Sequence, residues 1–195
     1  YASHLKTIKN VIGLRPGVRT PATVNGLVLP TGNLFLTDTF VNNDPSAEEL
    51  AEITMMAAKE VSLFGIEPQI ALISHSNYGS NNSPSAVKMR DVLALVREKA
   101  PELSIDGEMH CDVALSQRLR DDVMPDSPLK GAANLLVMPN MEAARISLNL
   151  LQGTATPTTV GPILMGLNKP AHILTSVSSV RRIINMVAIA AAKAQ

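Results

Sequence analysis

A complete strand, loop and helix occupy residues 70–99, with the sequence IALISHSNYGSNNSPSAVKMRDVLALVREK. The first four residues form an uncharged apolar run, which is typical of a strand buried on both faces of a sheet. Ten residues that are mostly small and polar follow at 74–83. Residues 85–99 then carry valine and leucine at helical spacing, and Pro101 ends that helix. A strand followed by a helix is the repeating unit of α/β folds.

The rest of the chain continues this alternation. Two β-rich runs at 23–29 and 33–37 flank the turn-forming Pro30-Thr31-Gly32, which predicts a hairpin. Asp44 and Pro45 then open a helix that Gly65 ends. Further strands are expected at 103–105, 133–138 and 158–165, and further helices at 113–119, 142–151 and 179–194. The predicted fold class is α/β, with a mostly parallel sheet and helices on both faces.

The composition favours a folded protein that binds small molecules or other proteins. The 195 residues are 46% hydrophobic and 17% charged, which excludes a disordered chain. Because 17 basic residues balance 17 acidic ones, no overall field attracts nucleic acid or a membrane surface. Aromatic residues make up only 3%, so platforms for stacking nucleic-acid bases are scarce.

The single cysteine and the chain start concern the setting of the protein. One cysteine excludes a disulfide framework and clusters of thiolate metal ligands, and it favours a reducing, cytoplasmic compartment. No apolar run reaches the roughly 18 residues that span a bilayer, and the start lacks the pattern of a signal peptide. Because the chain begins with Tyr1 and not with methionine, we expect a fragment of a longer polypeptide.

The polar loop at 74–83 is the first candidate site, because ligands in such sheets bind where strands end. Its hydroxyl and backbone donors, next to a helix start, suit a phosphate group. The alternative, a solvated loop with turn-forming asparagine and glycine, is about equally compatible with the composition.

Other patterns of chemical interest are weak. The four histidines, at positions 4, 75, 110 and 172, are too far apart to predict a zinc site, so no metal is expected. His110-Cys111-Asp112 resembles a nucleophile with its helpers, but neighbours in an extended segment point to opposite faces, and a buried, inert cysteine is expected instead. The glycine patterns of self-contained nucleotide sites are absent.

Four segments together resemble the phosphate acetyltransferase family, whose members move an acetyl group between CoA and phosphate. These segments are 37–53, 64–68, 72–74 and 161–170, the last of which reads GPILMGLNKP. The resemblance implies a protein of two α/β lobes, of which this chain contains the later part. Residues 1–174 would form the second lobe, and 175–195 a C-terminal helix that returns toward the largely missing first lobe.

The resemblance fails where the family carries its chemistry. In the enzymes a Ser-Arg pair and a later Asp stabilise the transferred group, bind phosphate and accept the thiol proton; their counterparts here are Thr175, Ser176 and Arg182. Ser176 lacks the cationic fork for phosphate, and Arg182 cannot accept a proton at physiological pH. A further family loop is replaced by Glu142-Ala143-Ala144-Arg145. The resemblance therefore implies an active centre that has lost its catalytic residues.

Residues 137–144, 172–175 and 180–186 look like the acetyltransferase-like C-terminal domain of large bacterial NADP-dependent malic enzymes. In that group an N-terminal half oxidatively decarboxylates malate to pyruvate, and the appended domain serves assembly and regulation by acetyl-CoA. The resemblance implies acetyl-CoA as effector, with NADP and a divalent metal confined to the missing half. It also implies a homodimer or higher homo-oligomer, joined to malic enzyme domains of the same polypeptide.

Three hypotheses follow. The first is a regulatory, acetyl-CoA-binding domain that is not itself catalytic; the second is an active phosphate acetyltransferase; the third is an oligomerisation module whose cleft binds nothing. The loop hydroxyls and Thr175 favour the first hypothesis over the third, because a cleft that binds nothing has no need of so many uncommitted polar groups. The candidate ligand-binding residues are Ser74, Ser76, Asn77, Tyr78, Gly79, Ser80, Thr175, Ser176 and Arg182.

Overall fold

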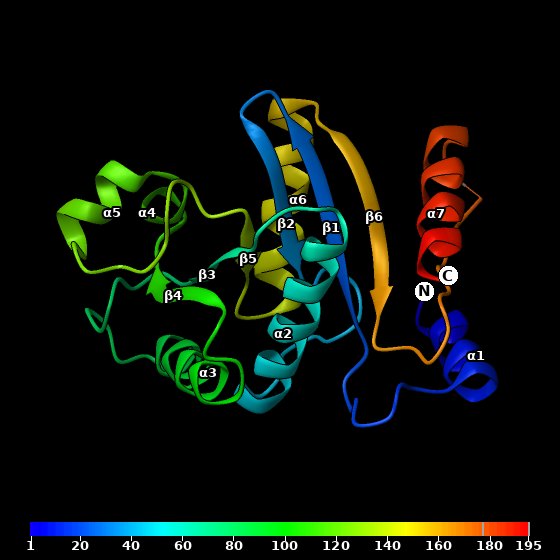
Figure 1. The fold of residues 1–195 in the computed structure, drawn as a ribbon, viewed down its shortest axis with the longest axis horizontal. Coiled ribbons are helices and arrows are strands. Elements are labelled where there is room, and N and C mark those ends of the chain that lie inside the picture. Colours follow the sequence, from blue (N-terminus) through cyan, green and yellow to red (C-terminus); the bar gives the residue numbers. More distant parts are fainter. Residues whose placement is uncertain (177, 195) are drawn as a thin grey trace.

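A computed structural model describes residues 1–176 and 178–194. Its centre is a six-stranded sheet with the strand order β4-β3-β5-β2-β1-β6 (Figure 1). The strands are β1 (Ala22–Leu29), β2 (Gly32–Thr37), β3 (Gln69–Ile73), β4 (Ser104–Met109), β5 (Leu135–Val137) and β6 (Thr158–Met165). The helices are α1 (Ala2–Ile12), α2 (Ala47–Leu63), α3 (Pro84–Lys99), α4 (Cys111–Leu115), α5 (Gln117–Val123), α6 (Met141–Ala155) and α7 (Val180–Lys193).

The sheet is mixed and mostly parallel, as predicted. Strands β2, β5, β3 and β4 pair in parallel, with Leu36 beside Leu136 and Ala71 beside Leu136. Strand β1 is antiparallel to both of its neighbours, β2 and β6. The predicted hairpin is confirmed, because Leu29 pairs with Gly32 across a turn of Pro30 and Thr31. Apart from β1, the described strands therefore run in one direction and end at one edge of the sheet.

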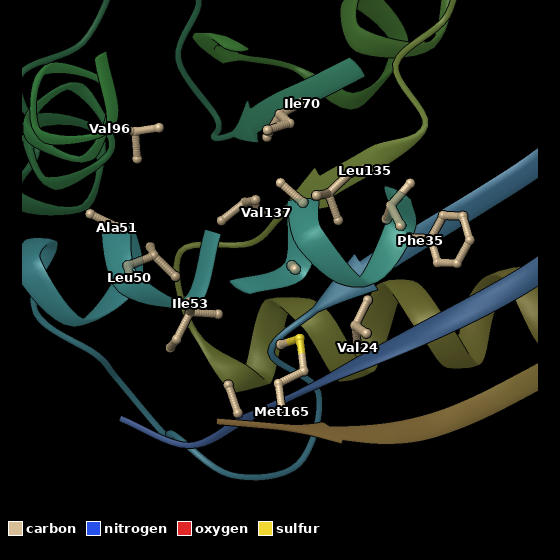
Figure 2. Packing of buried hydrophobic residues seen from close by; sticks show 14 of the residues in the cluster. Val24, Phe35, Leu50, Ala51, Ile53, Ile70, Val96, Leu135, Val137 and Met165 are labelled. Atoms are coloured by element: carbon tan, nitrogen blue, oxygen red, sulfur yellow. The ribbon is translucent and has the colours of Figure 1, made fainter. Parts of the chain in front are cut away.

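Alternating strand residues build a core on each face. Along β2, Phe35 contributes to one cluster, whereas Leu34 and Leu36 contribute to the other. Helices α2, α3 and α7 cover the first face, and Met186 of α7 is buried there. Figure 2 shows Leu50 of α2 in the same cluster. Helices α4 and α6 cover the second face. The prediction of helices on both faces is confirmed.

Local signals explain where α2 begins. The Ser46 side chain accepts a hydrogen bond from the Glu49 amide, while the Glu49 side chain accepts one from the Ser46 amide. This capping box satisfies two donors that the first turn leaves free. The expected cap was Asp44, whose side chain is instead paired with Lys88 at 2.6 Å. The helix start is therefore two residues later than the Asp44-Pro45 pattern indicates.

The third unit differs most from the sequence prediction. The single helix expected at 113–119 is two short helices, α4 and α5, because Ser116 is extended and caps α5 through the Leu119 amide. Strand β4 extends to Met109, beyond the predicted end at residue 105. Helix α1 was not predicted, and its residue Leu5 packs in a third cluster with Leu164 and Ile173.

The C-terminal helix lies beside β6, at the edge of the sheet (Figure 1). Its residue Met186 is buried in the first core cluster, so α7 is packed against the sheet lobe itself. Its outward residues Val180, Ile184 and Val187 are 61–73% exposed. The return of this helix toward a first lobe stays a prediction. Within the described residues, no helix has the length and apolarity needed to cross a bilayer.

Candidate functional site

The carboxyl ends of β2, β5, β3 and β4 meet at one edge of the sheet, and polar segments follow each of them. Asp38 follows β2, Asn140 follows β5 after a short connection, residues 74–83 follow β3, and His110 follows β4. This is the edge where ligands bind in open α/β sheets. Its chemistry depends on which of these polar groups are free.

The donors of the 74–83 loop are directed at a buried carboxylate. Glu108, on β4, is fully buried, and its Oε1 accepts hydrogen bonds from Ser76 Oγ at 2.7 Å and from the Gly79 amide at 2.9 Å. Arg90, on α3, donates to the same oxygen at 2.9 Å. The Ser80 hydroxyl contacts Ser76 and accepts the Asn77 amide. From the sequence, the polar groups of the loop are expected to be free for a ligand. That expectation is wrong, because they form hydrogen bonds to the buried Glu108 carboxylate or to one another.

Glu108 is ionised in this environment. Burial raises the pKa of its carboxyl, but hydrogen bonds from Ser76, Gly79 and Arg90 together outweigh burial and hold the pKa below its usual value. The other carboxyl oxygen, Oε2, is buried and has no hydrogen-bond partner in the described part of the chain. The negative charge of Glu108 at the centre of the loop repels a second anion. The geometry therefore favours a loop whose donors are used by its own hydrogen bonds over a loop that binds phosphate.

The remaining candidates in this loop also have internal partners. The Tyr78 hydroxyl donates to Asp106 at 3.0 Å, and Asn77 Oδ1 accepts the His110 amide at 2.8 Å. Ser74 Oγ accepts the Ser76 amide at 3.2 Å. Burial and the Asp106 carboxylate raise the pKa of Tyr78, so its phenol stays protonated. The loop is thus tied to β4 at several points.

Asp38 is saturated in the same way. Its Oδ1 accepts the Thr23 amide at 3.0 Å, and its Oδ2 accepts the Asn42 amide at 2.8 Å and the Asn42 side-chain amide at 2.7 Å. The Thr23 hydroxyl and the Phe40 amide donate to it as well. Asp38 is 3% exposed, so its visible role is to fix the segment that leaves β2.

The other candidate residues lie beyond β6. Thr175 and Ser176 are exposed, and the Thr175 amide donates to Ser178 Oγ at 3.1 Å. Arg182 is half-buried on the first turn of α7, where its Nε donates to the Gly161 carbonyl at 2.7 Å. Arg181 and Arg182 line a cavity of about 480 Å³ together with Ser179, Thr158 and Thr159, and none of the residues that line it is acidic.

The predicted site residues therefore form two groups. The 74–83 loop follows β3, whereas Arg182 contacts β6, and β5, β2 and β1 lie between these two strands. Four strand spacings correspond to roughly 19 Å. The chain does not bring the two groups into one pocket, because they follow or contact strands that lie four strand spacings apart in the sheet.

The expectation for Cys111 is wrong, and the expectation of no metal site stays a prediction. Cys111 is exposed, contrary to the expected burial, because it begins α4 at the surface. Partial burial of its thiol and the Asp112 carboxylate raise its pKa, which disfavours a thiolate nucleophile. In the ranges that the structure describes, no three His, Cys, Asp or Glu side chains are grouped to hold a metal.

Sequence reasoning missed Glu108, Arg90 and Asp106, which organise the loop. The predicted strand ended at residue 105, so Asp106 and Glu108 were not placed inside the sheet. The available signal was the spacing of these two acids around Gly107, which puts both within reach of the cations on α3.

Comparisons with known proteins agree with both resemblances found in the sequence. Residues 1–191 match the family described as Phosphate acetyl/butaryl transferase. An NADP-dependent malic enzyme of Haemophilus influenzae is 63% identical over 195 residues, which are 100% of this chain and 26% of that protein. A phosphate acetyltransferase of Bacillus subtilis is 33% identical over 193 residues, or 99% of this chain and 60% of that protein.

A solved structure gives the same answer for the fold. A phosphotransacetylase from Streptococcus pyogenes superposes with a TM-score of 0.94 at 32% identity, covering 99% of this chain and 59% of that one. The chain thus spans about a quarter of the length of the malic enzyme and just over half of the acetyltransferases. The division into residues 1–174 and 175–195 stays a prediction.

Proposed function

We propose that this chain, which belongs to the phosphate acetyl/butaryl transferase family, is the regulatory and oligomerisation domain of an NADP-dependent malic enzyme. In the parent protein, other domains would oxidatively decarboxylate malate to pyruvate with NADP and a divalent metal. This domain would bind acetyl-CoA and change that activity without transferring the acetyl group.

The observation that carries the proposal is the setting of Arg182. The resemblance assigns this position to the base that accepts the thiol proton, and a guanidinium cannot accept one at physiological pH. Its Nε is also held by the Gly161 carbonyl, so the side chain has a fixed structural partner. A cation at this point suits the binding of an anionic ligand and not proton transfer.

The cavity beside Arg182 has the chemistry of an anion site. Two guanidinium groups, the Ser179 hydroxyl and three threonines line about 480 Å³. Ser179 caps α7, so the positive end of the helix dipole points into the same region. Acetyl-CoA carries several phosphates, and we place one of its anionic groups here. Thr175 and Ser176, exposed before this helix, would contact the adjoining part of the ligand.

The test measures malate turnover by the full-length protein against acetyl-CoA concentration. Arg182→Ala should raise the acetyl-CoA concentration that gives the half-maximal effect by about tenfold or more, because charge-assisted hydrogen bonds contribute about 1.5–3 kcal/mol to binding. Turnover without acetyl-CoA should stay near the wild-type value. The matched control is Arg118→Ala, an exposed arginine on α5 that should leave the response unchanged.

Two results would reject this proposal. An unchanged dose response in Arg182→Ala would remove Arg182 from the effector site, and a wild-type enzyme insensitive to acetyl-CoA would end the regulatory hypothesis.

The second candidate function is an active phosphate acetyltransferase, which the 33% identity to the Bacillus subtilis enzyme favours. We expect no acetyl transfer between acetyl phosphate and CoA, because removal of a general base alone typically costs about 10²- to 10⁴-fold. Transfer above a protein-free control would contradict our assignment and support this second function.

A further inference from the structure

A basic groove lies at the opposite end of α7 from Arg182. It consists of two adjoining cavities of about 420 and 200 Å³ that share Arg15, Gly166 and Lys193. The end of β6, the second half of α2 and the last turn of α7 form its walls. Because α7 rises about 1.5 Å per residue, Arg182 and Lys193 are roughly 16 Å apart along the helix. The groove is therefore a different place from the cavity proposed for acetyl-CoA.

The charges in the groove are unbalanced. Arg15, Lys59, Lys169 and Lys193 line it, and Glu60 is the one carboxylate among its lining residues. Lys193 and Glu60 are paired at 2.5 Å, with both side chains largely buried. Within residues 1–176 and 178–194, the other three cations have no carboxylate within 4 Å. Three free cations thus converge in a chain whose formal charge is zero.

The two compartments differ in polarity. Asn168 and Lys169 line the smaller one, together with Arg15. Met56 and Leu63 line the larger one, where the Met56 thioether and the exposed Leu63 side chain offer an adaptable apolar surface. A ligand that fits both would carry an anionic group at one end and an apolar or flat group at the other.

We infer that this groove binds a phosphorylated small molecule of the nucleoside diphosphate type. The phosphates lie between Arg15 and Lys169, and the base lies against Met56 and Leu63. Arginine and lysine are the residues that proteins use for phosphate, and the groove offers both without a competing free carboxylate. The same chemistry is present in a free nucleotide and in the nucleotide end of CoA, so the experiment must separate these two sources.

The test is calorimetric titration of the 195-residue chain with ADP, pyrophosphate and adenosine. ADP should bind more tightly than pyrophosphate or adenosine alone, because it occupies both compartments. Lys169→Ala and Arg15→Ala should each weaken ADP binding about tenfold or more, consistent with loss of a charge-assisted contact. Lys130→Ala, which removes an exposed lysine near β5, is the matched control and should bind ADP like the wild type. Thermal unfolding of each variant verifies that it is folded.

The outcomes separate the groove from the acetyl-CoA proposal. Competition between acetyl-CoA and ADP identifies the nucleotide end of CoA as the occupant, whereas independent binding identifies a free nucleotide. Absence of ADP binding at millimolar concentration, or equal binding by folded Lys169→Ala and Arg15→Ala, would overturn the inference. Neither of those results would alter the predicted effect of Arg182→Ala on malate turnover.

Discussion

At the scale of single residues, Glu108 determines what the 74–83 loop can do. Its buried carboxylate is bound by a serine hydroxyl, a backbone amide and Arg90. Leaving one member of such a group unpaired costs about 3–5 kcal/mol when both partners are buried. Arg90 keeps a side-chain exposure of 29%, so the expected cost is smaller.

Glu108→Gln should therefore lower the free energy of unfolding by about 2 kcal/mol, because it removes the charge that Arg90 and the loop donors bind. Urea denaturation followed by circular dichroism measures this change. Glu102→Gln, at an exposed turn residue before β4, is the control and should stay within about 0.5 kcal/mol of the wild type. Equal stability of the two variants would show that the Glu108 charge does not hold the loop.

His172 makes stability depend on pH. Burial of the ring and the Lys193 ammonium lower its pKa from 6.5 to about 4, so the folded state keeps the ring neutral. As the pH is lowered from 6.5 to 4, the unfolded chain binds a proton that the folded chain does not. The free energy of unfolding therefore decreases over this range. The fall should be about 2 kcal/mol, once the partial exposure of the ring is considered.

The variant His172→Asn tests this pH dependence. Its side-chain oxygen can replace Nδ1 as acceptor for the Leu164 amide, and it has no proton to gain. Urea midpoints measured from pH 7 to pH 4 should fall less steeply than in the wild type. His4→Asn, at an exposed histidine of α1, should keep the wild-type slope. A wild-type slope in His172→Asn would show that other groups cause the acid sensitivity.

The polar residues of the 74–83 loop and of the segment around Arg182 could be recognised in the sequence. Their positions relative to each other in the fold could not be predicted. Ser76 and Gly79 were recognised as donors, yet their acceptor, Glu108, is contributed by β4. Such pairing depends on the order of strands in the sheet, which a single sequence does not encode locally. For the same reason, Arg182 was placed in one site with a loop that lies several strands away.

At the scale of elements, Arg120 holds α4, α5 and the following loop together. Its side chain is fully buried and donates to the carbonyls of Ala114, Leu129 and Gly131, with distances of 2.6–3.3 Å. No carboxylate is within 4 Å of it among the described residues. Backbone carbonyls thus replace the acidic partner that a buried arginine usually has.

Arg120→Met should destabilise the chain by about 3 kcal/mol, because the Leu129 and Gly131 carbonyls lose the donor that Arg120 supplies, whereas the Ala114 carbonyl keeps the Ala133 amide. Arg118→Met, two residues earlier on the exposed side of α5, provides a matched control for the loss of charge and of helix propensity. Urea denaturation compares the two. If they are equally stable, water or a rearranged loop satisfies the carbonyls that Arg120 binds.

The strands and long helices could be predicted because their apolar spacing is regular. The hairpin of β1 and β2 and the helices α2, α3 and α6 follow patterns confined to each segment. The division between α4 and α5 could not be predicted, because Ser116 breaks the helix to let Arg120 reach the loop carbonyls. Helix α1 had a signal in Leu5, Ile8 and Ile12, whose spacing is helical, but its partners at the end of β6 are distant in sequence.

At the scale of the whole molecule, α6 presents an apolar stripe to solvent. Ile146 and Leu150 are one helical turn apart and are 62% and 63% exposed, while Ala144 and Leu148 face the core. Two neighbouring exposed apolar residues of this size suit a symmetric contact between two copies.

We therefore expect a homodimer at micromolar concentration in analytical ultracentrifugation. Leu150→Glu should shift the wild-type dimer toward the monomer of 20.8 kDa, because it places a charge in an apolar contact. Asn149→Glu adds the same charge one residue away, at a polar exposed position, and should leave the dimer intact. A wild-type monomer, or a dimer that Leu150→Glu does not affect, would contradict this assignment of the interface.

The regulatory proposal makes a reciprocal prediction for the parent protein. Acetyl-CoA at Arg182 can change malate turnover only if it binds two states of the enzyme with different affinity. The coupling free energy is typically about 1–3 kcal/mol, and it must act equally in both directions. A dead-end malate analogue should therefore change the acetyl-CoA dissociation constant by about 5- to 150-fold in calorimetric titrations of the full-length enzyme. Acetyl-CoA must change the dissociation constant of the analogue by the same factor. If acetyl-CoA binds with the same affinity whether or not the malate site is filled, the bound ligand has no thermodynamic route to the catalytic domains, and regulation through this domain would be rejected even though the ligand binds.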